Sequence, residues 1–307
     1  MCSSKSYIKF ISSLLIFGSN GIVAGFIALK STEIVFYRSL IGSVFLIALL
    51  SVRKHRPALL KNRRHFLYLA AAGVSMGASW MFLYEAYNLV GVSMATLIYY
   101  CGPVIVMALS PFIFKEKLTL PKLMGFAAVL VGMFLVNSNS LSGGGFSSGI
   151  LYAFAGAIFF ALMMVFNKKA TGITGLENSA IQLFGAFAVT AFFLILNGGL
   201  PTSLPRQSII PVLIIGIVNT GIGTALYFSG MKALPVQTIA VCGYIEPLSA
   251  LIFSVVFLSE HLTAPQITGA ALILSGAAAG ELLSGRKVRL GYVTIKLPYV
   301  SIAKGHN

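Results

Sequence analysis

Apolar residues along the chain fall into ten stretches of about 20 residues, separated by short segments that carry most of the charged side chains. A helix of that length crosses the roughly 30 Å hydrocarbon core of a bilayer. The pattern therefore predicts an all-α, polytopic membrane protein with ten transmembrane helices and no soluble domain. The predicted helices cover residues 8–29, 33–52, 66–89, 92–113, 120–137, 149–166, 176–196, 209–230, 236–258 and 265–283.

Composition and charge support this prediction. Of the 307 residues, 57% are hydrophobic and 9% are charged, against about 25% charged in an average soluble domain. With the amino terminus inside, all 22 Lys and Arg except Lys30, Arg38 and Arg206 fall on the cytoplasmic side, as the positive-inside rule describes. We therefore expect a multi-pass protein of the cell (inner) membrane with both termini cytoplasmic. The net charge of +15 then reflects topology and contact with anionic lipids, and no nucleic acid is expected to bind.

Candidate catalytic and metal-binding chemistry is sparse in the sequence. It has no Asp, its four His lie in predicted loops or the tail, and Cys2, Cys101 and Cys242 have neither disulfide nor zinc spacing. A G-x-x-x-x-G-K-[ST] loop for ATP does not occur. We therefore expect that the protein is not an enzyme and that it has no metal site and no cofactor.

The two halves of the sequence are similar. A shift of 144 positions without a gap pairs eleven identical residues among the 33 positions that begin at Tyr100. Because each half holds five predicted helices, the halves enter the membrane with opposite orientation, which is the inverted-repeat arrangement of many secondary transporters. The predicted units are residues 1–145 (helices 1–5), 146–283 (helices 6–10) and a basic cytoplasmic tail, 284–307.

Short motifs stand at the boundaries of the predicted helices. They are Pro103 and Pro247 in the fourth and ninth helices, Lys115-Glu116-Lys117-Leu118-Thr119 and Ser259-Glu260-His261-Leu262-Thr263 after them, and Phe36-Tyr37-Arg38 in the second helix. With these motifs, residues 8–283 resemble the EamA family of the drug/metabolite transporter superfamily. The first helix departs from the family pattern, since Phe17-Gly18-Ser19-Asn20 replaces a frequent Trp-Gly, and the tail matches nothing known in the family.

The resemblance implies a transporter of small metabolites, whose relatives export amino acids, take up or export other metabolites, or extrude cationic drugs. We expect a gradient-driven exporter of metabolites such as amino acids, which works by alternating access with a central cavity between the repeats. Two alternatives stay open: a multidrug efflux pump for lipophilic cations, and a structural or sensory membrane protein that transports nothing. The sequence does not identify the substrate, the direction, the coupling ion or whether the chain forms a homo-oligomer.

Glu246 is the strongest candidate for a functional residue. It lies near the middle of the ninth predicted helix, next to Pro247, which removes a backbone donor and loosens the helix there. A charge inside a span is expensive and is usually kept for function or paired inside the bundle. Glu246 is expected to bind a substrate amine or cation, or to couple transport to a proton. The alternative is a protonated carboxyl that joins neighbouring helices by a hydrogen bond.

Arg38 and Glu85 are predicted at similar depths near the outer ends of the second and third helices. They can form an ion pair, and either a structural pair or a gate fits that position.

Aromatic side chains are the remaining candidates for the cavity. Trp80 and Tyr84, with Tyr87, recur at helical spacing, and Tyr99, Tyr100 and Tyr244 are predicted deep in their helices. They are expected to contact a planar or cationic substrate by stacking and cation–π interaction. The alternative is an interfacial aromatic belt.

Other polar and small residues are expected to be structural. Asn20 and Asn219 are expected to form hydrogen bonds across helices, and Glu116 and Glu260 to shape the loops after the fourth and ninth helices. Glycine pairs spaced by four are expected at close helix contacts. These pairs are Gly21 and Gly25, Gly73 and Gly77, and Gly276 and Gly280.

Overall fold

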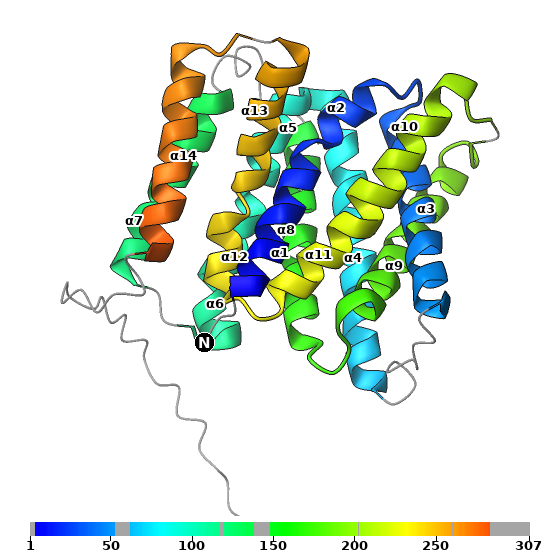
Figure 1. Ribbon diagram of the computed structural model, residues 1–307, viewed down its shortest axis with the longest axis horizontal. Coiled ribbons are helices and arrows are strands. Elements are labelled where there is room, and N and C mark those ends of the chain that lie inside the picture. Colours follow the sequence, from blue (N-terminus) through cyan, green and yellow to red (C-terminus); the bar gives the residue numbers. More distant parts are fainter. Residues whose placement is uncertain are drawn as a thin grey trace, which may run out of the picture.

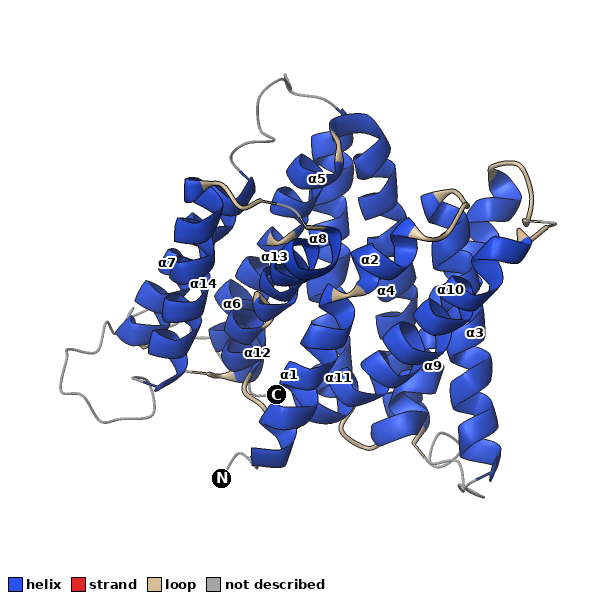
Figure 2. Cartoon of the chain, turned by 45° about the horizontal axis from the view of Figure 1, so that its top comes forward, coloured by secondary structure: helices blue, strands red, loops and turns tan. Residues whose placement is uncertain are grey.

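The fold is a bundle of helices (Figures 1 and 2). The computed structural model describes residues 4–52, 62–116, 119–137, 148–201, 203–259 and 261–282, and these residues form helices and no strands. In the first half the helices are α1 (Ser4–Gly18), α2 (Asn20–Gly25), α3 (Ser31–Val52), α4 (Arg63–Val90), α5 (Val92–Tyr99), α6 (Cys101–Phe114) and α7 (Leu120–Asn137). In the second half they are α8 (Ser148–Lys169), α9 (Gly175–Leu196), η3 (Arg206–Ser208), α10 (Ile209–Ile214), η4 (Ile215–Ile222), α11 (Gly223–Met231), α12 (Val236–Cys242), α13 (Ile245–Leu258) and α14 (Ala264–Leu282).

Several helical segments have the length and composition of membrane spans. Within the described ranges, eight are long and apolar enough to cross a membrane, and Leu120–Val136 is a shorter apolar helix. The chain is therefore a polytopic helical membrane protein, and the ten spans expected from the sequence stay a prediction. The basic tail, Glu260 and the loop at 53–61 lie outside the described residues.

Local structure follows the sequence similarity between the halves. Ser31 and Gly175 begin α3 and α9, and Leu120 and Ala264 begin α7 and α14, so each pair is 144 positions apart. Left-handed residues end both α6 and α13, because Lys115 has φ 57° and Ser259 has φ 56°. In each case the backbone N–H donates to the carbonyl oxygen of a serine five residues earlier.

The halves differ at two interruptions. The first span breaks at Ser19, between α1 and α2, whereas the corresponding α8 is continuous. In the second half a π-helix, η4, stands where α4 is a regular helix. Its Thr220 hydroxyl donates to the Ile215 carbonyl oxygen at 2.7 Å. Such wide turns often occur at functional sites.

Glycines bring α7 and α14 into close contact, and the two helices lie side by side in both views (Figures 1 and 2). A Cβ on Gly125 would come within 2.4 Å of the Gly276 carbonyl oxygen, and one on Gly132 within 2.6 Å of that of Gly269. The Gly73–Gly77 pair likewise packs on α9, as predicted. The Gly21–Gly25 prediction is wrong, because nothing lies within 4 Å of a Cβ at either position.

Candidate functional site

A cavity of about 610 Å³ lies inside the bundle and is lined by residues of both halves. It has the size of a small-molecule site, for which about 300–1,000 Å³ is typical. Its polar and aromatic lining includes Asn20, Arg38, Ser79, Trp80, Tyr84, Tyr87, Thr96, Tyr99, Tyr100, Thr224, Tyr227 and Glu246.

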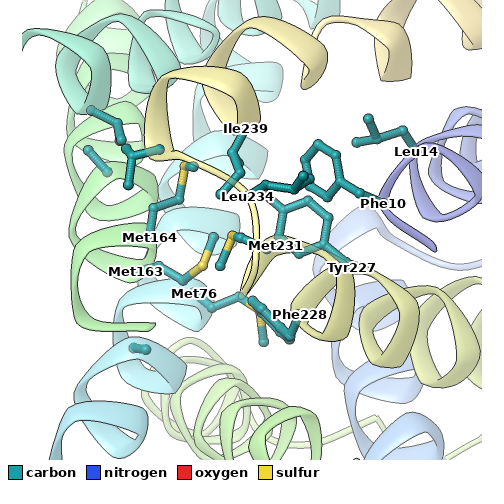
Figure 3. Close-up of a cluster of buried hydrophobic side chains, with 14 of the residues drawn as sticks. Phe10, Leu14, Met76, Met163, Met164, Tyr227, Phe228, Met231, Leu234 and Ile239 are labelled. Atoms are coloured by element: carbon teal, nitrogen blue, oxygen red, sulfur yellow. The ribbon is translucent and has the colours of Figure 1, made fainter. Parts of the chain in front are cut away.

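One end of the cavity is closed by apolar side chains. Figure 3 shows methionines from α4, α8 and α11 and aromatic rings from α1 and α11 converging on one another. Met76, Met163 and Met164 also line the cavity, whereas Phe10 and Met231 lie beyond the lining and are fully buried. We call this group of buried side chains the floor. It closes the end of the cavity on the side where α1 begins.

The opposite end of the cavity reaches the surface. Its lining there includes Ser31, at the start of α3, and Val92, at the start of α5, and both are exposed. These residues lie near α2 and α5, at the end of the bundle away from the start of α1 (Figure 1). Among the described residues, the cavity therefore opens at the end of the bundle where α3 and α5 begin.

Glu246 lines this cavity from the first turn of α13. Its backbone carbonyl oxygen accepts a hydrogen bond from the Ser249 hydroxyl at 2.8 Å. Its carboxylate has no hydrogen-bond partner in the described part of the chain, so no structural hydrogen bond between helices occupies it. Pro247, and Pro103 of the first half, line the same cavity. The carboxylate is therefore free to bind a ligand.

Arg38 points into the cavity and does not pair with Glu85, which corrects the expected ion pair. Its Nε donates to the Thr220 hydroxyl at 2.9 Å, and its guanidinium lies 5.0 Å from the centre of the Trp80 ring. Among the described residues its other N–H groups have no partner, and it interacts electrostatically with Glu246 across the cavity. Glu85 misses the cavity because it follows Tyr84 by one residue, a rotation of about 100° around α4.

Aromatic rings form much of the wall. Trp80, Tyr84 and Tyr87 line the cavity from one face of α4, and Tyr99 and Tyr100 complete it at the break between α5 and α6. The Ser79 hydroxyl holds Tyr99 in place, with the two oxygens 3.1 Å apart.

Tyr244 is not part of the wall, which corrects its expected role. Its side chain is fully buried, and its hydroxyl donates to the Tyr100 carbonyl oxygen at 2.8 Å. Its ring packs on those of Tyr100 and Phe126. Tyr244 therefore supports the cavity wall from behind.

The two asparagines behave differently. Asn219 joins helices as predicted, because its Nδ2 donates to the Ile16 carbonyl oxygen at 2.9 Å and to the Ser19 hydroxyl at 2.8 Å. Asn20 does not, since its Oδ1 is buried without a hydrogen-bond partner and the residue lines the cavity. The helix break at Ser19, which places Asn20 there, has no clear signal in the sequence.

Glu116 joins the halves of the chain beside the floor. Its carboxylate accepts hydrogen bonds from the backbone N–H groups of Val236 (2.7 Å) and Gln237 (3.1 Å), at the start of α12. A carboxylate suits that position because the first N–H groups of a helix lack partners inside it. Sequence reasoning expected Glu116 to shape its own loop and missed this contact across the chain.

Comparison with known proteins identifies the family. The sequence profile of the EamA-like transporter family matches residues 4–138 and again residues 147–279. The chain belongs to the EamA-like transporter family. An uncharacterized transporter of Bacillus subtilis, YxxF, is similar to this EamA-like chain, with 26% identity over 90% of this chain and 89% of that protein.

Further similarities agree with this membership. A probable amino-acid metabolite efflux pump of Salmonella typhimurium is 25% identical over 60% of this chain and 65% of its own length. One protein crystal structure, 21% identical in sequence, matches with a TM-score of 0.76 over 93% of this chain and 100% of that chain. The EamA-like chain therefore shares its fold with a solved structure and its family with proteins named as transporters.

Proposed function

We propose that this protein is a secondary transporter of the inner membrane that exports amino acids with apolar or aromatic side chains. Substrate zwitterions bind in the central cavity, between two inverted repeats of five helices each. The symmetric glycine contacts support the repeat arrangement, since Gly125 meets Gly276 and Gly132 meets Gly269, as a two-fold axis between α7 and α14 requires. Basic loops on one side support the cytoplasmic placement of both termini.

The observation that carries this proposal is a pair of opposite charges with free binding groups in one aromatic cavity. The unpartnered N–H groups of Arg38 fit a carboxylate, which guanidinium groups bind well. The carboxylate of Glu246 fits an ammonium group. Trp80, Tyr84 and Tyr99 offer ring faces to the side chain of the substrate.

Export is driven by protons that compete with the substrate for one carboxylate. From the outer side, Glu246 takes up a proton and releases the ammonium group of the substrate. On the inner side it loses the proton and binds a new substrate molecule. Because each state of Glu246 holds either a proton or an amine, an inward proton gradient drives outward transport. The relative named as an amino-acid metabolite efflux pump supports export as the direction.

Counterflow of labelled amino acids in proteoliposomes tests the proposal. We expect accumulation of phenylalanine, tyrosine or leucine with the native protein, and a rate that depends on the sign of the proton gradient. Glu246→Gln keeps a carbonyl acceptor but loses the titratable group, so exchange continues while the gradient dependence disappears. Glu33→Gln is the matched control, since Glu33 lies in the first turn of α3, outside the cavity lining, where its carboxylate accepts a hydrogen bond from the Lys30 backbone N–H at 2.9 Å.

Other results would replace the proposal. Transport of a lipophilic cation such as tetraphenylphosphonium, with no amino acid moving, indicates a drug efflux pump. We disfavour that function because the guanidinium of Arg38 adds a positive charge to the cavity. Absence of any flux indicates a protein that does not transport.

A further inference from the structure

The break in the first span leaves one polar atom without a partner. α1 ends at Gly18, where a Cβ would come within 1.9 Å of the Ser249 Oγ and 2.9 Å of the Ala250 backbone nitrogen. The chain therefore passes directly against α13 at this point. Asn20 begins α2 two residues later, and its side chain lines the cavity.

The Asn20 Oδ1 is an unusual atom in a folded protein. It is buried and has no hydrogen-bond partner among the described residues, although buried polar atoms are nearly always paired. Leaving an acceptor unpaired is costly, and the cost disappears when a ligand supplies the donor. Asn219, which packs against the same break, is the contrasting case because its amide donates to two oxygens of the protein.

We propose that the Asn20 Oδ1 accepts a hydrogen bond from the ammonium group of the substrate, beside Glu246, and makes the site selective for primary amines. This inference rests on the proposed function and adds the residue that determines specificity for the amine. Glu246 lies one helical turn before Ser249 on α13, so the contact of Gly18 with Ser249 brings the Asn20 segment to the same wall.

The chemistry of an ammonium group explains the selectivity. A primary ammonium has three N–H donors, which can serve Glu246 and Asn20 at the same time. Each N-methyl group replaces one donor by an apolar group. A second methyl leaves a single donor, so that one of the two acceptors receives no hydrogen bond from the ligand.

Counterflow competition measures this selectivity. Labelled phenylalanine competes with unlabelled phenylalanine, N-methylphenylalanine and N,N-dimethylphenylalanine, in the native protein and in Asn20→Ala. We expect the native protein to prefer phenylalanine over the dimethyl compound by about 10-fold or more, the effect of one hydrogen bond to a charged group. In Asn20→Ala the preference should fall to within about 3-fold, since no acceptor is left unpaired.

Two further variants separate ligand binding from other roles. Asn20→Asp keeps the acceptor and adds negative charge, so it should retain the preference for the primary amine. Loss of phenylalanine transport in Asn20→Asp would instead indicate that the amide N–H binds the substrate carboxylate, and would overturn the proposal. Asn219→Ala is the matched control for stability: we expect a lower Tm and an unchanged preference.

The outcomes distinguish this inference from the proposed function. If the native protein transports phenylalanine and Asn20→Ala keeps the full preference, the inference is wrong and the proposed function stands. If no amino acid moves, transport of labelled phenethylamine and of labelled N,N-dimethylphenethylamine is measured directly. A preference for the primary amine that Asn20→Ala removes then supports the inference without the proposed function. Transport of neither amine overturns both.

Discussion

The carboxylate of Glu116 should hold the cavity closed at the floor. It accepts two backbone hydrogen bonds at the start of α12, from Val236 and Gln237. The side-chain Nε2 of Gln237 also donates a hydrogen bond to the Ser110 hydroxyl at 3.2 Å. These contacts join α6 of the first half to α12 of the second, next to the floor. We expect α6 and α12 to separate when the floor opens, which breaks these contacts.

Glu116→Gln is the smallest change that weakens this contact. The amide keeps one acceptor oxygen and presents a donor where the second acceptor stood, so one charge-assisted hydrogen bond disappears. Such a bond contributes about 1.5–3 kcal/mol. If it exists only in the closed state, its loss shifts the equilibrium toward the open floor by about 10- to 150-fold.

Cys242 provides the assay because it belongs to the floor and is only 7% exposed. In a protein with Cys2→Ser and Cys101→Ser, a membrane-impermeant maleimide is added to inverted vesicles, which expose the side of the floor in the proposed topology. We expect Glu116→Gln to raise the labelling rate of Cys242 at least several-fold. Glu33→Gln, which alters a carboxylate outside the cavity, should leave the rate unchanged.

An unchanged labelling rate in Glu116→Gln, with the protein still folded, would refute this reasoning. It would mean that Glu116 contributes equally to both states and acts as an ordinary helix cap. Faster labelling from the opposite side of the membrane would contradict it as well, because it would place the floor at the wrong end of the cavity.

Three further variants test packing and the cavity wall. Gly125→Ala puts a Cβ within 2.4 Å of the Gly276 carbonyl oxygen and should lower stability by about 1–3 kcal/mol in thermal unfolding, whereas Gly21→Ala, with open space around it, should lower it by far less. Tyr244→Phe should cost about 0.5–1.5 kcal/mol for one lost hydrogen bond, with the substrate KM unchanged; a raised KM would return this residue to the binding site. Trp80→Leu removes the ring beneath the guanidinium and should raise KM for phenylalanine about 2- to 30-fold, and an unaltered KM would exclude the ring from binding.

Much of the cavity could be predicted from the sequence because charges in apolar spans must face the inside of the bundle. Glu246 had no acceptable place on the lipid side, and Trp80 and Tyr84 share a face at helical spacing. The sequence also placed Gly276 at a close helix contact, and the structure shows which helix it meets, since Gly276 packs against Gly125 of α7.

The sequence does not predict which way each helix is rotated about its axis, or where a helix is broken or locally widened. Arg38 and Glu85 are predicted at matching depths, yet only Arg38 lines the cavity. Glu85 follows the cavity residue Tyr84 by one position, and one residue along a helix turns the side chain by about 100°. The break at Ser19, beside the close contact of Gly18 with Ser249, and the π-helix η4 do not alter the hydrophobic pattern of their spans, so the pattern does not predict them. Without that break, Asn20 looks like any polar residue that joins two helices.

The most direct test of the central claim is the recognition of both charges of the substrate. Proteoliposomes with the native protein are loaded with phenylalanine, and uptake of labelled phenylalanine is competed with 3-phenyllactate, which lacks the amine, and with phenethylamine, which lacks the carboxylate. We predict that unlabelled phenylalanine competes at least 10-fold better than either analogue, because only the zwitterion uses both Arg38 and Glu246. Equal competition by phenethylamine would contradict the account, since the cavity would then bind cations without regard to the carboxylate.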